Sequence, residues 1–190
     1  MTHSLAAMDE PAAPAFEKVL KDDGTILVSP YDSRWPQLAG EVIGRIRAAL
    51  GPAALRIEHV GSTSVPGLAA KPVIDIDLVV ADTTQEDAYL PALQAAGFRF
   101  HLREPDWFAH RLFKGENPAV NLHVFPDGCE EVERMLAFRD HLRADVADRR
   151  LYEETKHRLA ALRWDKVQDY ADAKAQVVSD IMQRALSRPA

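Results

Sequence analysis

The segment that most constrains this chain covers residues 73–80, where apolar and acidic side chains alternate. A period of two residues predicts a β-strand, with Asp75 and Asp77 together on one face and four apolar side chains on the other. At a rise of about 3.3 Å per residue, the two carboxylates are spaced by about 7 Å along the strand. Like charges on one face repel each other unless a cation lies beside them. A divalent metal ion is the simplest cation that fits.

The same alternation has a simpler interpretation, because acidic side chains often cover the solvated face of a sheet. Val73 and Val79 share the face of the two aspartates, however, and a strand this apolar is expected near the centre of a sheet. Carboxylate oxygens are the ligands that magnesium prefers, and a metal held by them can neutralise phosphates during an in-line attack. We therefore predict a metal site at Asp75 and Asp77.

A glycine-serine pair, Gly61-Ser62, ends the apolar segment before this strand. Glycine lets the backbone approach a ligand closely, and a serine hydroxyl with successive N–H groups can hold a phosphate. The pair is also common in ordinary turns, so both interpretations stay open. The loop that follows adds Thr63, Ser64 and Lys71 as candidates for phosphate contact.

Periodicity elsewhere predicts helices and strands. Apolar residues at helical spacing predict a helix that ends at Gly51, with Asp32 or Ser33 as its cap, and a second helix is expected from Thr83 or Thr84 to Ala96. Strands are expected at 25–28, 98–102, 111–114 and 120–125, and helices at 130–142, 145–163 and 168–187. This order predicts an α/β (α+β) fold, a mixed sheet with flanking helices and a helical C-terminal part at 130–188.

Length and composition limit the class of protein. With 190 residues and 47% hydrophobic content, the chain is expected to form one domain over 17–190, after a flexible tail at 1–16 rich in alanine and proline. A net charge of −6 argues against binding to an extended nucleic acid. Cys129 is the single cysteine, and neither a signal peptide nor an apolar run of about 18 residues is present. We predict a cytoplasmic protein with no membrane partner.

The predicted strand at 120–125 places Asn121, His123 and Phe125 on the face opposite its apolar residues. His123 is therefore a candidate base or ligand beside the aspartates. The alternative is a histidine that packs beside Phe125 and serves only the core. Glu58, before the glycine-serine pair, is a further candidate acid.

Several basic residues could bind a triphosphate. Arg139 and Arg143 are four residues apart, and Lys156 and Lys174 each follow a tyrosine by four residues, so each pair shares a helical face. Arginine suits bidentate phosphate contact, and tyrosine can stack on a base. Arg111 and Lys114 are further candidates on their predicted strand. Residues of these kinds are also common as surface charge or in a core, and that alternative stays open.

Together these features resemble a known family. Gly-Ser, a spacer and Asp-x-Asp on a strand resemble the signature of the polymerase-beta-type nucleotidyltransferase superfamily, and HVGSTSVPGLAAKPVIDIDLVV is similar to the hallmark stretch of its GrpB family. The similarity extends to PYDSRW, NLHVF, FRDHLR and both Tyr-x-x-x-Lys helices, over about residues 28–185. It implies a nucleotidyltransferase-like fold, with Gly61 and Ser62 at the phosphate-binding turn and Asp75 and Asp77 as ligands of magnesium or manganese.

One position departs from the superfamily pattern. A third carboxylate on a following strand usually activates the attacking hydroxyl, and here the best-placed residue is His123, which binds magnesium less readily. The leading hypothesis is a metal-dependent nucleotidyltransferase that uses an NTP and a small-molecule acceptor. One alternative is a non-catalytic module that binds a nucleotide or a CoA-like metabolite on the same scaffold. The other alternative is a metal-dependent phosphohydrolase that uses Asp75, Asp77 and His123.

Overall fold

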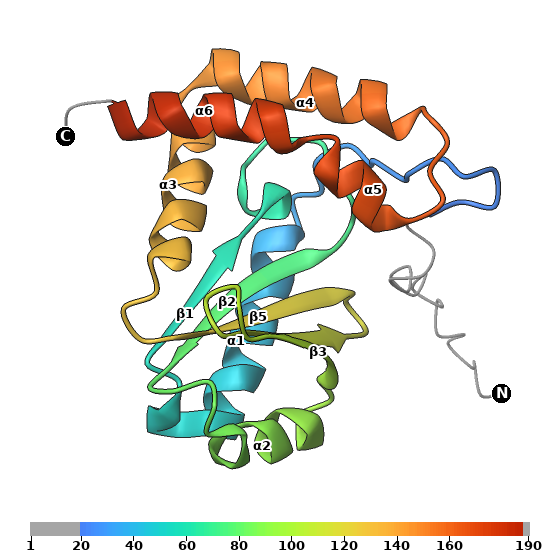
Figure 1. Cartoon of the computed structure of the whole chain (residues 1–190). Coiled ribbons are helices and arrows are strands. Elements are labelled where there is room, and N and C mark those ends of the chain that lie inside the picture. The colour runs from blue at the N-terminus through green and yellow to red at the C-terminus, as the bar shows by residue number, and fades with distance from the viewer. Residues whose placement is uncertain (1–19, 188–190) are drawn as a thin grey trace, which may run out of the picture.

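The structure is a computed structural model that describes residues 20–187. A five-stranded sheet lies at its centre (Figure 1). The tail predicted at 1–16 lies outside the described residues. The strands are β1 (Arg56–Val60), β2 (Ile74–Val80), β3 (Arg99–Glu104), β4 (His110–Gly115) and β5 (Val120–Pro126). Their order is β1-β2-β5-β4-β3, with β2 and β5 parallel and the other pairs antiparallel. The predicted mixed sheet is confirmed.

The central pair β2 and β5 sets the polar face of the sheet. Asp75 lies opposite Asn121 in the register, and Asp77 lies opposite His123. Because direct partners across a sheet project to the same face, these side chains form two adjacent polar rows. Ile76 belongs to the apolar core on the other face. The alternation predicted for both strands is confirmed.

One face of the sheet is covered by α1 (Trp35–Leu50) and α2 (Leu90–Ala95). The apolar spacing in α1 buries Val42 and Ile46 against the sheet, and the helix ends at Gly51, as predicted. The second helix is shorter than predicted. It begins with a proline in its first turn, and Thr83 does not cap it, because the Thr83 hydroxyl donates to the carbonyl of Ala109.

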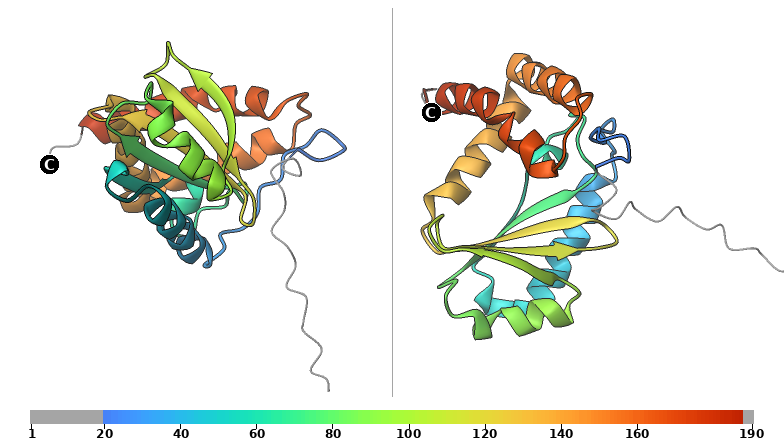
Figure 2. Two further views of the ribbon diagram at one scale, coloured as in Figure 1. Left: turned by 90° about the horizontal axis from the view of Figure 1, so that it is seen from below. Right: turned by 45° about the vertical axis from the view of Figure 1, so that its right-hand side comes forward.

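On the other side of the sheet lies α3 (Glu130–Ala144), and the later helices lie beyond one end of the strands, as the right-hand view of Figure 2 shows. These are α4 (Val146–Ala160), α5 (Val167–Asp172) and α6 (Ala175–Ser187). The single helix predicted at 168–187 is wrong, because the chain leaves the helix at 173–174 and starts a new one. The strand predicted at 25–28 is reduced to one bridge, Leu20 to Ile26. Within residues 20–187, no helix is long and apolar enough to span a bilayer.

Candidate functional site

The glycine-serine turn and the first aspartate of β2 are in direct contact. Gly61 follows β1 with φ 68° and ψ −173°, a conformation that glycine tolerates and other residues resist. A Cβ atom added there would lie 2.3 Å from Oδ2 of Asp75. The chain then forms a short 3-10 turn, Ser62–Ser64, in which the Ser64 hydroxyl donates to the carbonyl of Gly61 over 2.6 Å. Glycine is therefore required here so that the carboxylate can lie against the turn.

A short hydrogen-bond chain holds the other oxygen of Asp75. The side-chain amide of Asn121 donates to Oδ1 of Asp75 over 2.7 Å, and Lys114 donates to the amide oxygen of Asn121 over 2.6 Å. Burial raises the pKa of Asp75, while the Asn121 bond and the nearby lysines oppose that rise. The carboxylate is thereby fixed in one orientation by strands β4 and β5.

A small cavity of about 140 Å³ opens between this part of the sheet and the C-terminal helices. Its walls come from the turn after β1, the loop before β2, the two central strands, helices α4 and α5, and the link from α5 to α6. The lining residues are Gly61, Ser62, Thr63, Lys71, Val73, Asp75, Asn121, Tyr152, Lys156, Tyr170 and Lys174. Segments far apart in the sequence thus meet at one polar cavity.

Three lysines dominate the charge of the cavity. Burial lowers the pKa of Lys71 to about 8 and that of Lys156 to about 7, and burial also lowers the pKa of Lys174. Mutual repulsion adds to the effect, because Lys174 lowers the pKa of both neighbours. Asp75 is the carboxylate that favours the charged forms of Lys71 and Lys174. The cavity is thus a concentrated cationic environment.

Asp77 lies one row further along the same face and does not line the cavity. Its side chain is 1% exposed, and neither carboxylate oxygen has a hydrogen-bond partner among the described residues. Burial, followed by the charges of Asp75, Glu131 and Glu58, raises the pKa of Asp77 to about 8. A buried acid without a donor is costly, so this position is not explained by the stability of the fold.

His123 is joined to the surface by a second histidine. Nδ1 of His123 lies 3.0 Å from Nε2 of His110, whose Nδ1 lies 2.8 Å from the carboxylate of Glu104. The two imidazoles stack with centroids 5.1 Å apart, beside Phe125. Burial lowers the pKa of His123 to about 3, so the ring is neutral at physiological pH. With Glu104 accepting from His110, His123 donates through Nδ1 and its Nε2 carries the lone pair.

The three candidate arginines do not line the cavity. Arg143 donates to the carbonyl of Ser64, and Arg139 donates to Glu58 and to the carbonyl of His59, so both support the outside of the glycine-serine turn. Arg111 lies on the opposite face of the sheet, where it pairs with Glu86 over 2.7 Å. Ser64 is likewise turned into its own loop and is absent from the cavity wall.

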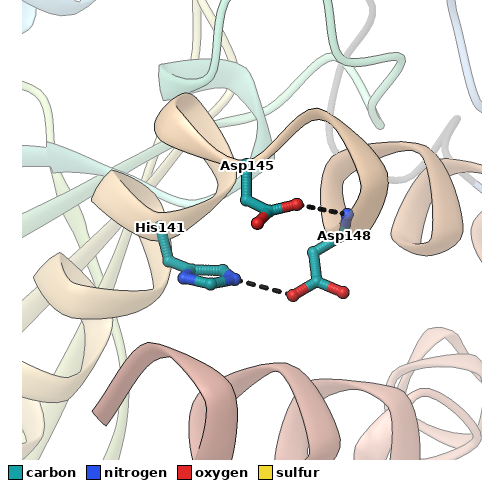
Figure 3. A group of neighbouring side chains, drawn as sticks. All are labelled: His141, Asp145 and Asp148. Carbon is teal, nitrogen blue, oxygen red and sulfur yellow. Dashed lines mark hydrogen bonds and ion pairs between the residues drawn. The ribbon is translucent and has the colours of Figure 1, made fainter. Parts of the chain in front are cut away.

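A separate polar cluster joins the C-terminal helices (Figure 3). His141, Asp145 and Asp148 are the one group of three histidine or carboxylate residues, within residues 20–187, whose ligand atoms lie within 4.8 Å of one another. Their atoms are already engaged: Asp148 accepts from His141 at 2.7 Å and from Arg184 at 2.7 Å, and Asp145 caps α4 through the N–H of Asp148. Because the Arg184 cation lies on Asp148, we interpret this cluster as a link between α3, α4 and α6.

Comparison with known proteins decides the family. The family model described as GrpB protein matches residues 25–184. The chain belongs to the GrpB family. A UPF0157 protein of Halalkalibacterium halodurans is 53% identical to it over 163 residues, which are 86% of this chain and 84% of that protein. The crystal structure of the conserved protein GrpB from Enterococcus faecalis is 29% identical and has a TM-score of 0.75, covering 84% of this chain and 97% of that chain.

Structures of the Cid1 poly(U) polymerase are more distant from this GrpB chain. One of them, in complex with the short product ApU, has 14% identity and a TM-score of 0.48 over 68% of this chain and 42% of that chain. Likeness at this level carries no argument about activity, and the chemistry must come from the site itself.

Sequence reasoning missed two parts of the site. Strand alternation places Asn121 on the correct face, but its bond to Asp75 depends on the register between β2 and β5. The Glu104–His110 pair behind His123 depends on the pairing of β3, β4 and β5. The two tyrosines that line the cavity could be found from the sequence, because each precedes a candidate lysine by four residues.

Proposed function

We propose that this GrpB protein is a metal-dependent nucleotidyltransferase, which moves a nucleoside monophosphate from an NTP to a small-molecule acceptor. The observation that carries the proposal is the direct packing of the Gly61-Ser62 turn on Asp75 at a cationic cavity. The turn and the cavity suit phosphate groups, and Asp77 continues the acidic face toward His123.

The two aspartates fit a magnesium or manganese ion. Asp77 supplies two buried oxygens without a hydrogen-bond partner in the described part of the chain, and Asp75 lies two residues away on the same face. Magnesium commonly takes one or two protein carboxylates together with substrate phosphates and water, so a third protein ligand is not needed. When bound, the ion would neutralise the phosphates around the reacting phosphorus.

The remaining residues have separate roles in this proposal. Ser62 and Thr63 bind the outer phosphates, and Lys71, Lys156 and Lys174 balance their charge. The acceptor oxygen bonds to the α-phosphorus as the bond from that phosphorus to the leaving pyrophosphate breaks. Nε2 of His123 accepts a hydrogen bond from the acceptor hydroxyl and orients it, and the hydroxyl proton passes to water as the bond to phosphorus forms. The Glu104–His110 pair holds the imidazole in the required tautomer.

The test follows label from each NTP, marked at the α-phosphate, into a small-molecule extract in the presence of magnesium. We expect transfer by the wild type and a loss of at least about 100-fold in Asp75→Asn and in Asp77→Asn. Asp87→Asn, at an exposed aspartate away from the cavity, is the matched control and should retain full activity. No transfer by the wild type, or undiminished transfer by Asp75→Asn, removes the proposal.

One observation favours a second candidate, a binding module without turnover. The position at which the superfamily pattern expects a third carboxylate holds His123, which faces His110 rather than a ligand through Nδ1. Calorimetry with NTP and magnesium separates the two candidates. Tight binding without labelled product after long incubation supports the module.

A further inference from the structure

The charges on the wall of the cavity do not balance. Lys71, Lys156 and Lys174 line it together with one carboxylate, that of Asp75. Burial, together with the charges of Lys174 and Lys71, lowers the pKa of Lys156 to about 7. A buried cation without a counter-charge is costly, so the wall is stabilised by a change that adds a negative charge to it.

Lys156 differs from the other two lysines in the charges that surround it. Asp75 favours the charged forms of both other lysines, but it is not among the groups that shift the pKa of Lys156. The carboxylate that acts on Lys156 is Glu153, which lies outside the wall, is partly exposed and accepts from the N–H of Ala69 over 3.1 Å. A negative charge built on Lys156 therefore meets two cations of the wall without facing Asp75.

The amine of Lys156 keeps a reactive electron pair. With a pKa of about 7, about half of these side chains are neutral at pH 7. A neutral amine has two N–H groups and one lone pair, and Lys156 donates one N–H to the carbonyl of Ala69. The lone pair is then available for attack on an electrophilic carbon. A lysine that is desolvated beside other cations is an activated nucleophile.

We propose that Lys156 is a carbamylation site, at which its amine takes up carbon dioxide reversibly. The lone pair of the nitrogen forms a bond to the carbon of carbon dioxide, and one C–O π pair moves onto oxygen. The nitrogen passes one proton to water, so the product is a carbamate anion that retains one N–H. That N–H continues to donate to the carbonyl of Ala69, and neither an oxidant nor a reductant takes part.

The wall supplies the partners that a carbamate needs. It would hold two cations, Lys71 and Lys174, against two anions, Asp75 and the carbamate, so its charges would balance. Tyr170 is fully buried in the same wall, and its hydroxyl has no hydrogen-bond partner in the described part of the chain. Lys174 and Lys71 lie over its ring, at 4.6 and 5.7 Å from the centroid. Two ammonium groups and an unused donor are therefore held on one wall.

The cavity has room for the added atoms. Its volume is about 140 Å³, and roughly 10 to 15 Å³ is enough for one water molecule. A carboxyl group of one carbon and two oxygens fits within it. On Lys71 or Lys174 the same group would lie beside Asp75, whose like charge disfavours it. The wall therefore selects Lys156.

The modification goes beyond the proposed function and would regulate it. A carbamate replaces a cation of the wall by an anion, so it opposes the phosphate groups that the proposed function places there. Nucleotide binding would then weaken as dissolved carbon dioxide rises. This consequence rests on the proposed function, whereas the modification itself does not.

The experiment equilibrates the full chain with ¹³C-labelled bicarbonate, without nucleotide or metal, and records the ¹³C NMR spectrum. We expect a carbamate signal, separate from that of bicarbonate, whose intensity saturates as the label is increased. Methylation of the carbamate with an oxonium reagent, followed by peptide mass spectrometry, should place it on the peptide that holds Lys156. This mass measurement needs no variant, so the assignment does not depend on how a substitution folds.

Substitutions in the wall test the reasoning. Lys156→Arg should remove the carbamate from this peptide, because a guanidinium stays protonated. Lys71→Gln and Lys174→Gln should each lower the carbamate occupancy by at least about threefold at half-saturating label, because each removes a cation beside the carbamate. Lys166→Arg, at an exposed lysine outside the cavity, is the matched control and should stay within about twofold of the wild type.

Three results would overturn the proposed site. These are no carbamate signal at saturating label, label found only on exposed amines, and an occupancy that neither Lys71→Gln nor Lys174→Gln changes. Because nucleotide is absent from the measurement, a failure of nucleotidyl transfer leaves the carbamate signal unaffected, and the two proposals can fail separately.

Discussion

Gly61→Ala is expected to destabilise the chain by about 2.5 to 6 kcal/mol, in two separable parts. The first part is conformational. Residues with a Cβ atom rarely adopt φ 68° and ψ −173°, and holding alanine in this conformation costs about 1 to 3 kcal/mol. The second is steric, because the new Cβ would lie 2.3 Å from Oδ2 of Asp75. The carboxylate must then turn away and lose the hydrogen bond from Asn121, which is worth about 1.5 to 3 kcal/mol.

Gly67→Ala is the matched control. Gly67 also has a positive φ, 78°, but no heavy atom outside its chain neighbours lies within 4 Å of an added Cβ. It should lose only the conformational part, about 1 to 2 kcal/mol. Urea unfolding followed by tryptophan fluorescence measures both variants, and Gly61→Ala made in an Asp75→Ala chain should cost only the conformational part. A difference below about 1 kcal/mol between the two glycine variants would refute the argued contact.

Three further predictions concern buried charges. Burial lowers the pKa of Lys156 to about 7 from 10.5, so the unfolded chain binds more protons between these values and stability rises with pH. Lys156→Met should reduce this slope in urea unfolding curves, and the part that comes from Lys71 should remain. Asp77 makes the stability depend on pH in the opposite direction. Burial raises the pKa of Asp77 from 3.8 to about 8, so in metal-free protein stability falls as pH rises between these values. Asp77→Asn should therefore be more stable at pH 7 in EDTA by about 2 to 4 kcal/mol. Asp148→Ala removes the acceptor that holds Arg184 and should lower stability by about 1.5 to 3 kcal/mol, with faster proteolysis near the end of α6, where Arg184 lies. A flat pH profile in the wild type would contradict the first prediction. An Asp77→Asn chain that is less stable than the wild type would contradict the second, and unchanged proteolysis of Asp148→Ala would contradict the third.

Local periodicity predicts the polar face of the sheet, because strand alternation is a property of the segment itself. Asp75 and Asp77 share a face in β2, and Asn121 and His123 share it in β5, as the sequence pattern indicates. The same rule separates Arg111 from the site. It lies three residues before Lys114, so the two side chains project to opposite faces, and Lys114 is the one that bonds to Asn121.

Tertiary contacts determine where helices break and which side chains reach the cavity, and periodicity does not predict either. The pattern of apolar residues continues across 173–174, yet the helix breaks there, Tyr170 packs against Val73, and Lys174 lines the cavity. The bond from Arg143 to the carbonyl of Ser64 joins residues 79 positions apart, so its supporting role cannot be read from local spacing. A binding residue and a supporting residue of the same type look alike in the sequence alone.

The sheet forms the floor of the cavity, and α4 and α5 form its roof. Because the roof comes later in the sequence, the cavity is incomplete during part of protein synthesis. Domains fold as the chain leaves the ribosome, from the N-terminus onward. A nascent chain that has completed β5 still lacks Tyr152, Lys156 and Lys174, so it has the aspartates but no cationic roof. If the cavity binds phosphate as proposed, binding begins only after the later helices have emerged and docked, and a half-made chain does not compete with the finished protein for the ligand.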